Sequence, residues 1–120
     1  LNPSGYESFN YRGLSKYYLD DDKGAIEDYT KAIELDAEDP DAYFSRGLSK
    51  SYLDDDKGAI EDFTKAIELD AEDADAYYNR GLSKSNLENY YGALASACSC
   101  PTLRECFNAF PPLLSHRHGR

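Results

Sequence analysis

The sequence predicts an all-α fold, a solenoid of antiparallel helix pairs, and three observations carry this prediction. The chain of 120 residues repeats itself with a period of 34 residues, and a fixed period of this size is typical of stacked helical units. Within each unit, apolar residues recur at helical spacing, as they do at Ala59, Ile60, Phe63, Ala66 and Ile67. Residues that start helices stand at matching places in successive units.

The two complete copies are nearly identical. Residues 6–39 (repeat 1) align with residues 40–73 (repeat 2), and 26 of the 34 positions are the same. A degenerate repeat 3 covers residues 74–97, and its match thins to Gly92 and Ala93. We therefore expect a helical array over residues 1–97, in which each unit forms two helices.

Helix boundaries can be placed from capping residues. Asp39 and Pro40 predict the start of the first helix of repeat 2, because Asp caps helices and Pro needs no partner for a missing N–H at the first helical position. The acidic triplets at 20–22 and 54–56 predict the turn inside each unit and place negative charge at the start of its second helix. Ser4 and Glu7 have the spacing of a capping box and predict the first helix of the chain.

Small residues also recur at fixed intervals. A glycine precedes an alanine by twelve residues in every unit, at Gly13, Gly47 and Gly81. Because glycine inside a helix costs about 1 kcal/mol relative to alanine, we expect close approach of the paired helices there. A 34-residue helix–turn–helix unit with these spacings resembles the tetratricopeptide repeat (TPR), over residues 1 to 93. The resemblance implies a right-handed superhelix with a concave groove lined by the first helix of each unit.

The sequence departs from the TPR pattern at two kinds of position. The expected proline near the end of each unit is Ala37 and Ala71, which we expect to loosen the turn. The usual aromatic residue of the first helix is a lysine (Lys16, Lys50 and Lys84), which we expect to change surface chemistry more than fold. The first five residues resemble the end of a preceding unit, so we expect this chain to be a piece of a longer array.

The predicted groove follows from the differences between the two complete copies. Seven of their eight differences fall in the first helix or its entry, although drift on an exposed face would give the same pattern. The aromatic and leucine side chains offer pockets for apolar groups, and an acidic rim favours a basic partner. The predicted groove residues are Asn10, Leu14, Tyr17, Phe44, Leu48, Ser51, Tyr78, Asn79, Leu82 and Ser85, with Glu7, Asp41 and Asp75 at the rim.

These observations predict a non-catalytic protein- or peptide-binding scaffold without a cofactor. The alternative is a structural segment that self-associates end to end. The repeats hold no nucleophile–base pair or phosphate loop, so we do not expect an enzyme. Chaperone-tail receptors of the TPR family clamp a C-terminal carboxylate with Lys, Asn and Arg. The matching positions here contain no cation, so we do not expect a carboxylate-clamp co-chaperone; they are Asn10, Leu14, Ser45, Asp75 and Asn79.

The charge distribution reduces the classes of partner that we expect. The chain has 23 acidic and 13 basic residues and a net charge of −10, which argues against nucleic acids and anionic membrane surfaces. It shows no secretory signal or apolar stretch of bilayer length, so we expect a cytoplasmic location. Each unit also repeats an Arg–Lys pair at i,i+4. We expect these pairs to meet Glu27/Asp28 and Glu61/Asp62 across the paired helices rather than to form a basic stripe for a ligand.

Residues 98–120 form an aberrant tail that contains all three cysteines and both histidines. Thr102 and Glu105 have capping-box spacing and precede an apolar helical pattern, so one interpretation is a capping helix over 103–110. The other is a segment foreign to the array. Zinc binding by Cys98, Cys100, Cys106, His116 and His118 is disfavoured by the Cys-x-Cys spacing. The acidic triplets do not match a calcium-binding EF-hand loop either, since glycine falls fifth from Asp20 and the twelfth residue is Lys31. We expect no metal.

Overall fold

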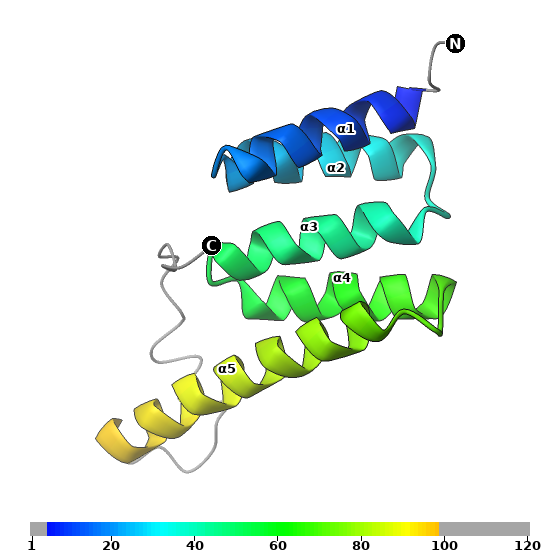
Figure 1. The fold of residues 1–120 in the computed structure, drawn as a ribbon. Helices are drawn as coiled ribbons and strands as arrows, with labels where there is room; N and C mark the ends of the chain where they lie inside the picture. Colours follow the sequence, from blue (N-terminus) through cyan, green and yellow to red (C-terminus); the bar gives the residue numbers. More distant parts are fainter. Residues whose placement is uncertain (1–4, 99–120) are drawn as a thin grey trace.

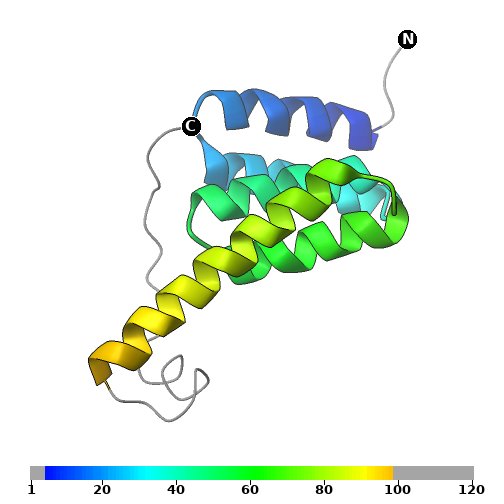
Figure 2. The same cartoon turned by 60° about the horizontal axis from the view of Figure 1, so that its bottom comes forward.

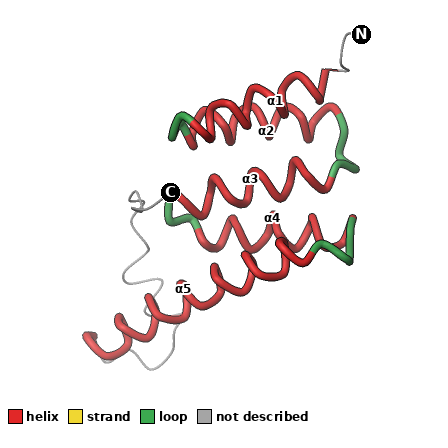
Figure 3. The backbone as a smooth tube through the Cα atoms, viewed as in Figure 1, coloured by secondary structure: helices red, strands yellow, loops and turns green. Residues whose placement is uncertain are grey.

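A computed structural model describes residues 5–98 as five stacked α-helices (Figures 1 and 3). They are α1 (Gly5–Tyr18), α2 (Asp22–Leu35), α3 (Pro40–Tyr52), α4 (Asp56–Leu69) and α5 (Ala74–Cys98). The helices α1 and α2 pack as one antiparallel pair and α3 and α4 as the next, and each helix also contacts the following one along the chain. No strand occurs within 5–98. The predicted all-α repeat solenoid is therefore confirmed.

The predicted caps are present where they fall inside this range. Asp39 caps α3, since its Oδ1 accepts a hydrogen bond from the backbone N–H of Asp41 at 3.0 Å, and Pro40 occupies the first turn. Ser4 of the expected capping box lies outside the described residues. So do the predicted helix over 103–110 and the tail cysteines and histidines beyond residue 98.

The turns between repeats are closed without proline. Asp36 follows α2, and its Oδ1 accepts a hydrogen bond from the backbone N–H of Glu38 at 3.0 Å. Asp70 makes the equivalent bond to Glu72 at 3.1 Å. A side-chain oxygen that binds the backbone two residues on imitates a backbone turn. These bonds span Ala37 and Ala71, the positions at which the sequence lacks the proline of the family.

The acidic triplets form the turn inside each complete repeat. Asp20 and Asp54 have φ angles of 62° and 63°, in the left-handed region that Asp tolerates better than most residues. The next residue caps the second helix, as Asp55 does when its Oδ1 accepts from the N–H of Gly58 at 3.0 Å. One residue therefore reverses the chain and the following one starts the new helix.

The third unit differs, because it forms one helix of 25 residues instead of a helix pair. Glu88 stands where Asp54 adopts the left-handed conformation, and glutamate adopts that conformation much less readily. The helix α5 therefore continues, and its last turns extend past the ends of the other helices in Figures 1 and 2. Two helices per unit is correct for repeats 1 and 2 and wrong for residues 74–97.

The core of each complete repeat lies between its paired helices. A methyl group on Gly47 of α3 would lie 2.8 Å from the ring of Phe63, and one on Gly13 of α1 would lie 2.9 Å from the ring of Tyr29. Both rings are buried. The close helix approach that the repeated glycines predicted is thus confirmed in repeats 1 and 2. It is wrong at Gly81 of the third unit, where no atom lies within 4 Å of the equivalent methyl position.

Candidate peptide-binding groove

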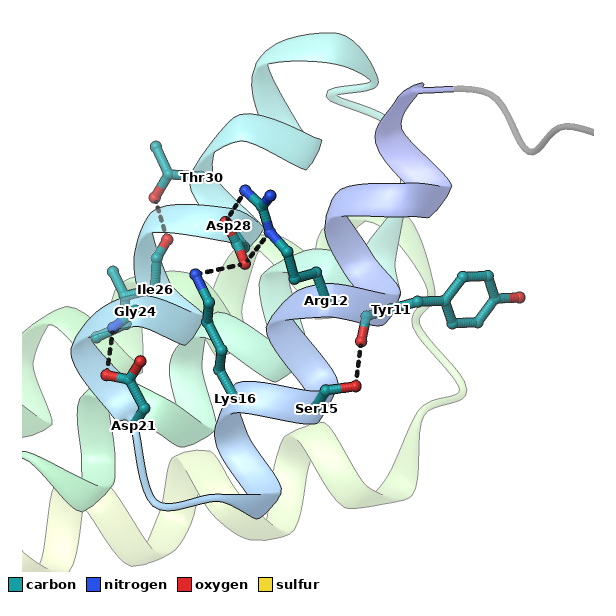
Figure 4. A network of polar contacts seen from close by, with 9 residues as sticks. All are labelled: Tyr11, Arg12, Ser15, Lys16, Asp21, Gly24, Ile26, Asp28 and Thr30. Atoms are coloured by element: carbon teal, nitrogen blue, oxygen red, sulfur yellow. Dashed lines mark hydrogen bonds and ion pairs between the residues drawn. The ribbon is translucent and has the colours of Figure 1, made fainter.

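Each complete repeat holds a buried carboxylate between two cations. Figure 4 shows Arg12 and Lys16 of α1 converging on Asp28 of α2. Asp28 accepts from Arg12 Nε at 2.9 Å and from Arg12 Nη2 at 2.8 Å, and Lys16 Nζ lies 3.0 Å from its Oδ2. The hydrogen bond from Arg12 lowers the pKa of Asp28, while burial of the carboxyl opposes this shift.

The second repeat makes the same arrangement, with its two cations less exposed than those of repeat 1. Asp62 is 4% exposed and accepts from Arg46 at 2.8 and 2.7 Å, with Lys50 Nζ at 3.0 Å. The side chain of Arg46 is 17% exposed, against 58% for Arg12. The hydrogen bond to Asp62 raises the pKa of Arg46.

The predicted cross-helix pairing is therefore confirmed for two of its four carboxylates. Asp28 and Asp62 accept the cations, while Glu27 and Glu61 are exposed. Both Asp28 and Asp62 are buried. Lys16 and Lys50, which replace an aromatic residue of the TPR pattern, each contact one of these carboxylates. These clusters hold the paired helices together behind the predicted groove.

The predicted groove residues lie on α1, α3 and α5, and these three helices contact one another in order. At the first junction the side chains largely contact the protein itself. Asn10 Nδ2 donates to Asp39 Oδ2 at 2.8 Å. The ring of Tyr17 lies 5.7 Å from that of Tyr52 in a T-shaped arrangement. Leu14 is exposed, so it is the residue most available to a ligand here.

The middle of the predicted groove is partly core. The ring of Phe44 lies 5.6 Å from the ring of Phe63, and Phe44 packs against the cluster that contains Tyr43 and Ala66. Leu48 and Ser51 are half-buried. Truncation of Phe44 would therefore disturb the fold as well as any bound ligand.

The α5 part of the predicted groove is the most open. Tyr78 is 67% exposed, and Leu82 and Ser85 are also exposed. Asn79 is half-buried, and its Nδ2 donates to the backbone oxygen of Asp75 at 2.8 Å. Large apolar surface at this end is accessible to a partner.

An open pocket of about 410 Å³ lies at the turn between α4 and α5. It brings together two of the three predicted rim residues, whereas the third, Glu7, lies in the first turn of α1 beside the hydroxyl of Tyr6. Its lining is five carboxylates, one alanine and one aromatic ring: Asp41, Phe44, Asp70, Glu72, Asp73, Ala74 and Asp75. The carboxylates at 70, 72 and 73 were not predicted, although the acid-rich segment between the repeats could have indicated them.

The crowding of carboxylates at the pocket affects the pKa of one of its own residues. Partial burial raises the pKa of Asp41, and the carboxylates of Asp39, Asp73 and Asp70 add to the shift. The equivalent junction between repeats 1 and 2 carries Asn10 where this pocket has Phe44. Asn10 donates to Asp39 there, so one carboxylate of that junction is already bound.

Two other kinds of site are absent from the described part of the chain. No helix within 5–98 combines the length and the apolar character needed to cross a bilayer. Over the same residues, no group of histidine, cysteine and carboxylate side chains is arranged to hold a metal ion.

Antiparallel helix pairs that stack in a repeating order along the chain define a helical-repeat scaffold. A family model described as "TPR repeat" matches residues 2–50 and 53–87. The chain therefore belongs to the TPR repeat family, as its sequence resemblance indicated. This family is generally a non-catalytic fold of protein–protein interaction.

Solved structures agree with this assignment. The Arabidopsis OM64 TPR domain is 26% identical, with a TM-score of 0.69 over 88% of this chain and 83% of that chain. The TPR2AB domain of yeast Sti1, in a complex with pHSP90, is 25% identical, with a TM-score of 0.70 over 92% of this chain and 42% of that one. The first TPR of Spaghetti (RPAP3), bound to the HSP90 peptide SRMEEVD, shares the fold at 20% identity and a TM-score of 0.68, over 93% of this chain and 98% of that one. No match is found among curated protein sequences.

Proposed function

We propose that the concave face of α1, α3 and α5 binds a segment of a partner protein in which a basic side chain stands next to apolar ones. The acidic pocket beside Phe44 supports this proposal. A lysine or arginine in that pocket would meet several carboxylates and could lay its aliphatic stem on the aromatic ring. Tyr78 and Leu82 follow Asp75 on one face of α5, at i+3 and i+7, and would contact the apolar neighbours.

The proposed ligand differs in charge from the peptides of two similar structures. The Sti1 and Spaghetti domains are described with HSP90 or an HSP90 peptide. In this chain the five positions that match the carboxylate clamp hold no cation, and Asp75 would repel a terminal carboxylate. We therefore infer a scaffold that selects basic rather than acidic segments.

A pair of matched peptides tests this selection. One is SRMEEVD with a free C-terminus, and the other is SRMKKVK with a C-terminal amide, which keeps the first three residues and the valine. Calorimetric titration of the full chain at physiological salt should give an affinity about tenfold or more higher for the basic peptide, since like charges oppose the acidic one. Micromolar binding of SRMEEVD, or equal binding of both peptides, would overturn the proposal.

Substitutions distinguish binding in the groove from a general attraction by the negative net charge. The double variant Asp41→Asn, Asp75→Asn should weaken binding of the basic peptide severalfold. The matched control is Glu27→Gln, Glu61→Gln, which removes the same charge from exposed positions on α2 and α4 and should leave the affinity nearly unchanged. Equal losses in both double variants would show that net charge alone attracts the peptide.

A further inference from the structure

We propose that α5 carries a docking site for an amphipathic helix of another polypeptide, one that contains an aspartate followed directly by an aromatic residue. This site uses the face of α5 that carries Tyr77, Arg80, Gly81 and Lys84. The proposed groove uses a different face of α5, so the two proposals are independent. The helices α1 and α3 each bury this face against the second helix of their own repeat. Because the third unit continues as one helix, α5 has no such partner among the described residues.

The first part of the site is a seat for an aromatic ring. Gly13 and Gly47 lie against the rings of Tyr29 and Phe63 so closely that an added methyl group would lie 2.9 and 2.8 Å away. At the equivalent Gly81, no atom lies within 4 Å of that methyl position. The aromatic residue four positions earlier reflects the same difference, because Tyr43 is 9% exposed and Tyr77 is 44% exposed.

The second part is a cation that is already positioned. In repeat 2, the guanidinium of Arg46 lies 5.7 Å from the ring centre of Tyr43, and its Nη1 lies 3.2 Å from Thr30 Oγ1. Arg80 repeats both contacts, at 5.5 Å from Tyr77 and 3.3 Å from Thr64 Oγ1. The carboxylate that completes the arrangement around Arg46 has no equivalent near Arg80 within residues 5–98.

Lys84 completes the cationic half of the site. It stands four residues after Arg80, as Lys50 stands four residues after Arg46. Lys50 binds the buried Asp62 at 3.0 Å, whereas Lys84 contacts no acidic side chain in the described part of the chain. A carboxylate that reached α5 at this register would therefore receive the same three hydrogen-bonding groups that Asp62 receives.

The second helices of repeats 1 and 2 indicate which residues a helix bound to α5 would need. Both α2 and α4 present an aspartate and then an aromatic residue, with alanine three residues later: Asp28, Tyr29 and Ala32, and Asp62, Phe63 and Ala66. The aligned residues of the third unit are Ser96 and Ala97. After residue 98 the only acidic residue is Glu105, and cysteine follows it. Residues 1–120 therefore contain no third pair of this kind.

A second copy of the chain is a poorer occupant. Its two Asp–aromatic pairs are already buried against its own α1 and α3. End-to-end stacking would bring α1 of the copy to α5, and α1 carries no Asp–aromatic pair. The cations of this face thus favour a helix from a different polypeptide, one whose Asp–aromatic pair is accessible.

The α4 sequence of this chain provides a defined probe. A synthetic peptide of residues 56–69 contains the helix that α3 binds inside repeat 2. An isolated helix of 14 residues is only marginally stable in water, so binding is best followed at millimolar peptide by amide shifts of the isotope-labelled full chain. We expect saturable shifts at Gly81, Arg80 and Lys84. Replacing Asp62 or Phe63 in the peptide by alanine should weaken binding about tenfold or more.

A matched pair of variants makes the test specific. Gly81→Ala leaves the free protein folded, because the methyl group enters open space, but it occupies the seat of the incoming ring and should weaken peptide binding about tenfold. Gly92→Ala is the control, since it also adds a methyl to open space on α5 and should bind normally. Three results would overturn the proposal: no saturable shift at Gly81, equal binding of both variants, or sedimentation of the full chain alone as a dimer with this face protected.

Discussion

Replacement of Asp62 by asparagine should destabilise the fold strongly, although it removes no atom from the packing. Asp62 is 4% exposed and forms ion pairs with both Arg46 and Lys50. Loss of one member of a fully buried ion pair costs about 3–5 kcal/mol. Here the cations keep 17% and 21% of their side-chain exposure and asparagine still accepts one hydrogen bond, so we expect a loss of about 2 kcal/mol. For a domain of this size that corresponds to a Tm lower by roughly 8–16 °C.

Urea unfolding followed by far-ultraviolet circular dichroism measures this loss. The control is Glu61→Gln, which makes the same chemical change at the preceding, exposed residue and should alter the unfolding free energy by no more than about 0.5 kcal/mol. If Asp62→Asn also stayed within that margin, the carboxylate would not be the bridge that its geometry indicates. If both variants lost equal stability, general charge rather than the buried cluster would be responsible.

Two further predictions concern stability. Gly47→Ala should lower the unfolding free energy by about 1–3 kcal/mol, because its methyl group would press on the buried ring of Phe63. Gly81→Ala should raise the unfolding free energy by about 0.5–1 kcal/mol, because alanine favours the helix and its methyl group enters open space. Denaturation that ranks the two variants in the opposite order would contradict this packing. The hydrogen bond from Arg12 lowers the pKa of Asp28 in the folded state, so its stabilisation is present above pH 3.8 and is lost as pH falls through the lower folded pKa. Below pH 3.8 the unfolding free energy of the wild type should therefore fall more steeply than that of Asp28→Asn, and equal slopes in acid titrations would refute this coupling.

Much of the fold could be predicted from the sequence because its determinants are local and repeated. Asp39 and Pro40 start a helix by short-range hydrogen bonding and backbone geometry, so their effect does not depend on distant contacts. The pairing of Asp28 and Asp62 with the Arg–Lys pairs follows from residue spacing on two antiparallel helices. Burial of these carboxylates was not predicted, since exposure depends on how neighbouring repeats cover them.

Two features could not be predicted from the sequence: the single helix of the third unit and the acidic pocket. The reasons differ. The end of a helix at Asp54 rests on one residue in a sparsely populated conformation, and the change to Glu88 is small in sequence but large in backbone preference. The pocket forms where a turn of repeat 2 faces α3, so Asp70 and Asp73 meet Asp41 only after the repeats stack. Sequence spacing alone does not show that these three carboxylates lie close together.

The stacking order has a mechanical consequence. In the described part of the chain each helix touches only helices one or two places away, and the stack is elongated, with principal extents of 59 × 29 × 24 Å. A tensile load between its ends would pass from one repeat to the next in series, because no contact joins described helices more than two places apart. Such an arrangement behaves like springs joined end to end: its compliance is the sum over the junctions, and the junction with the lowest barrier yields first.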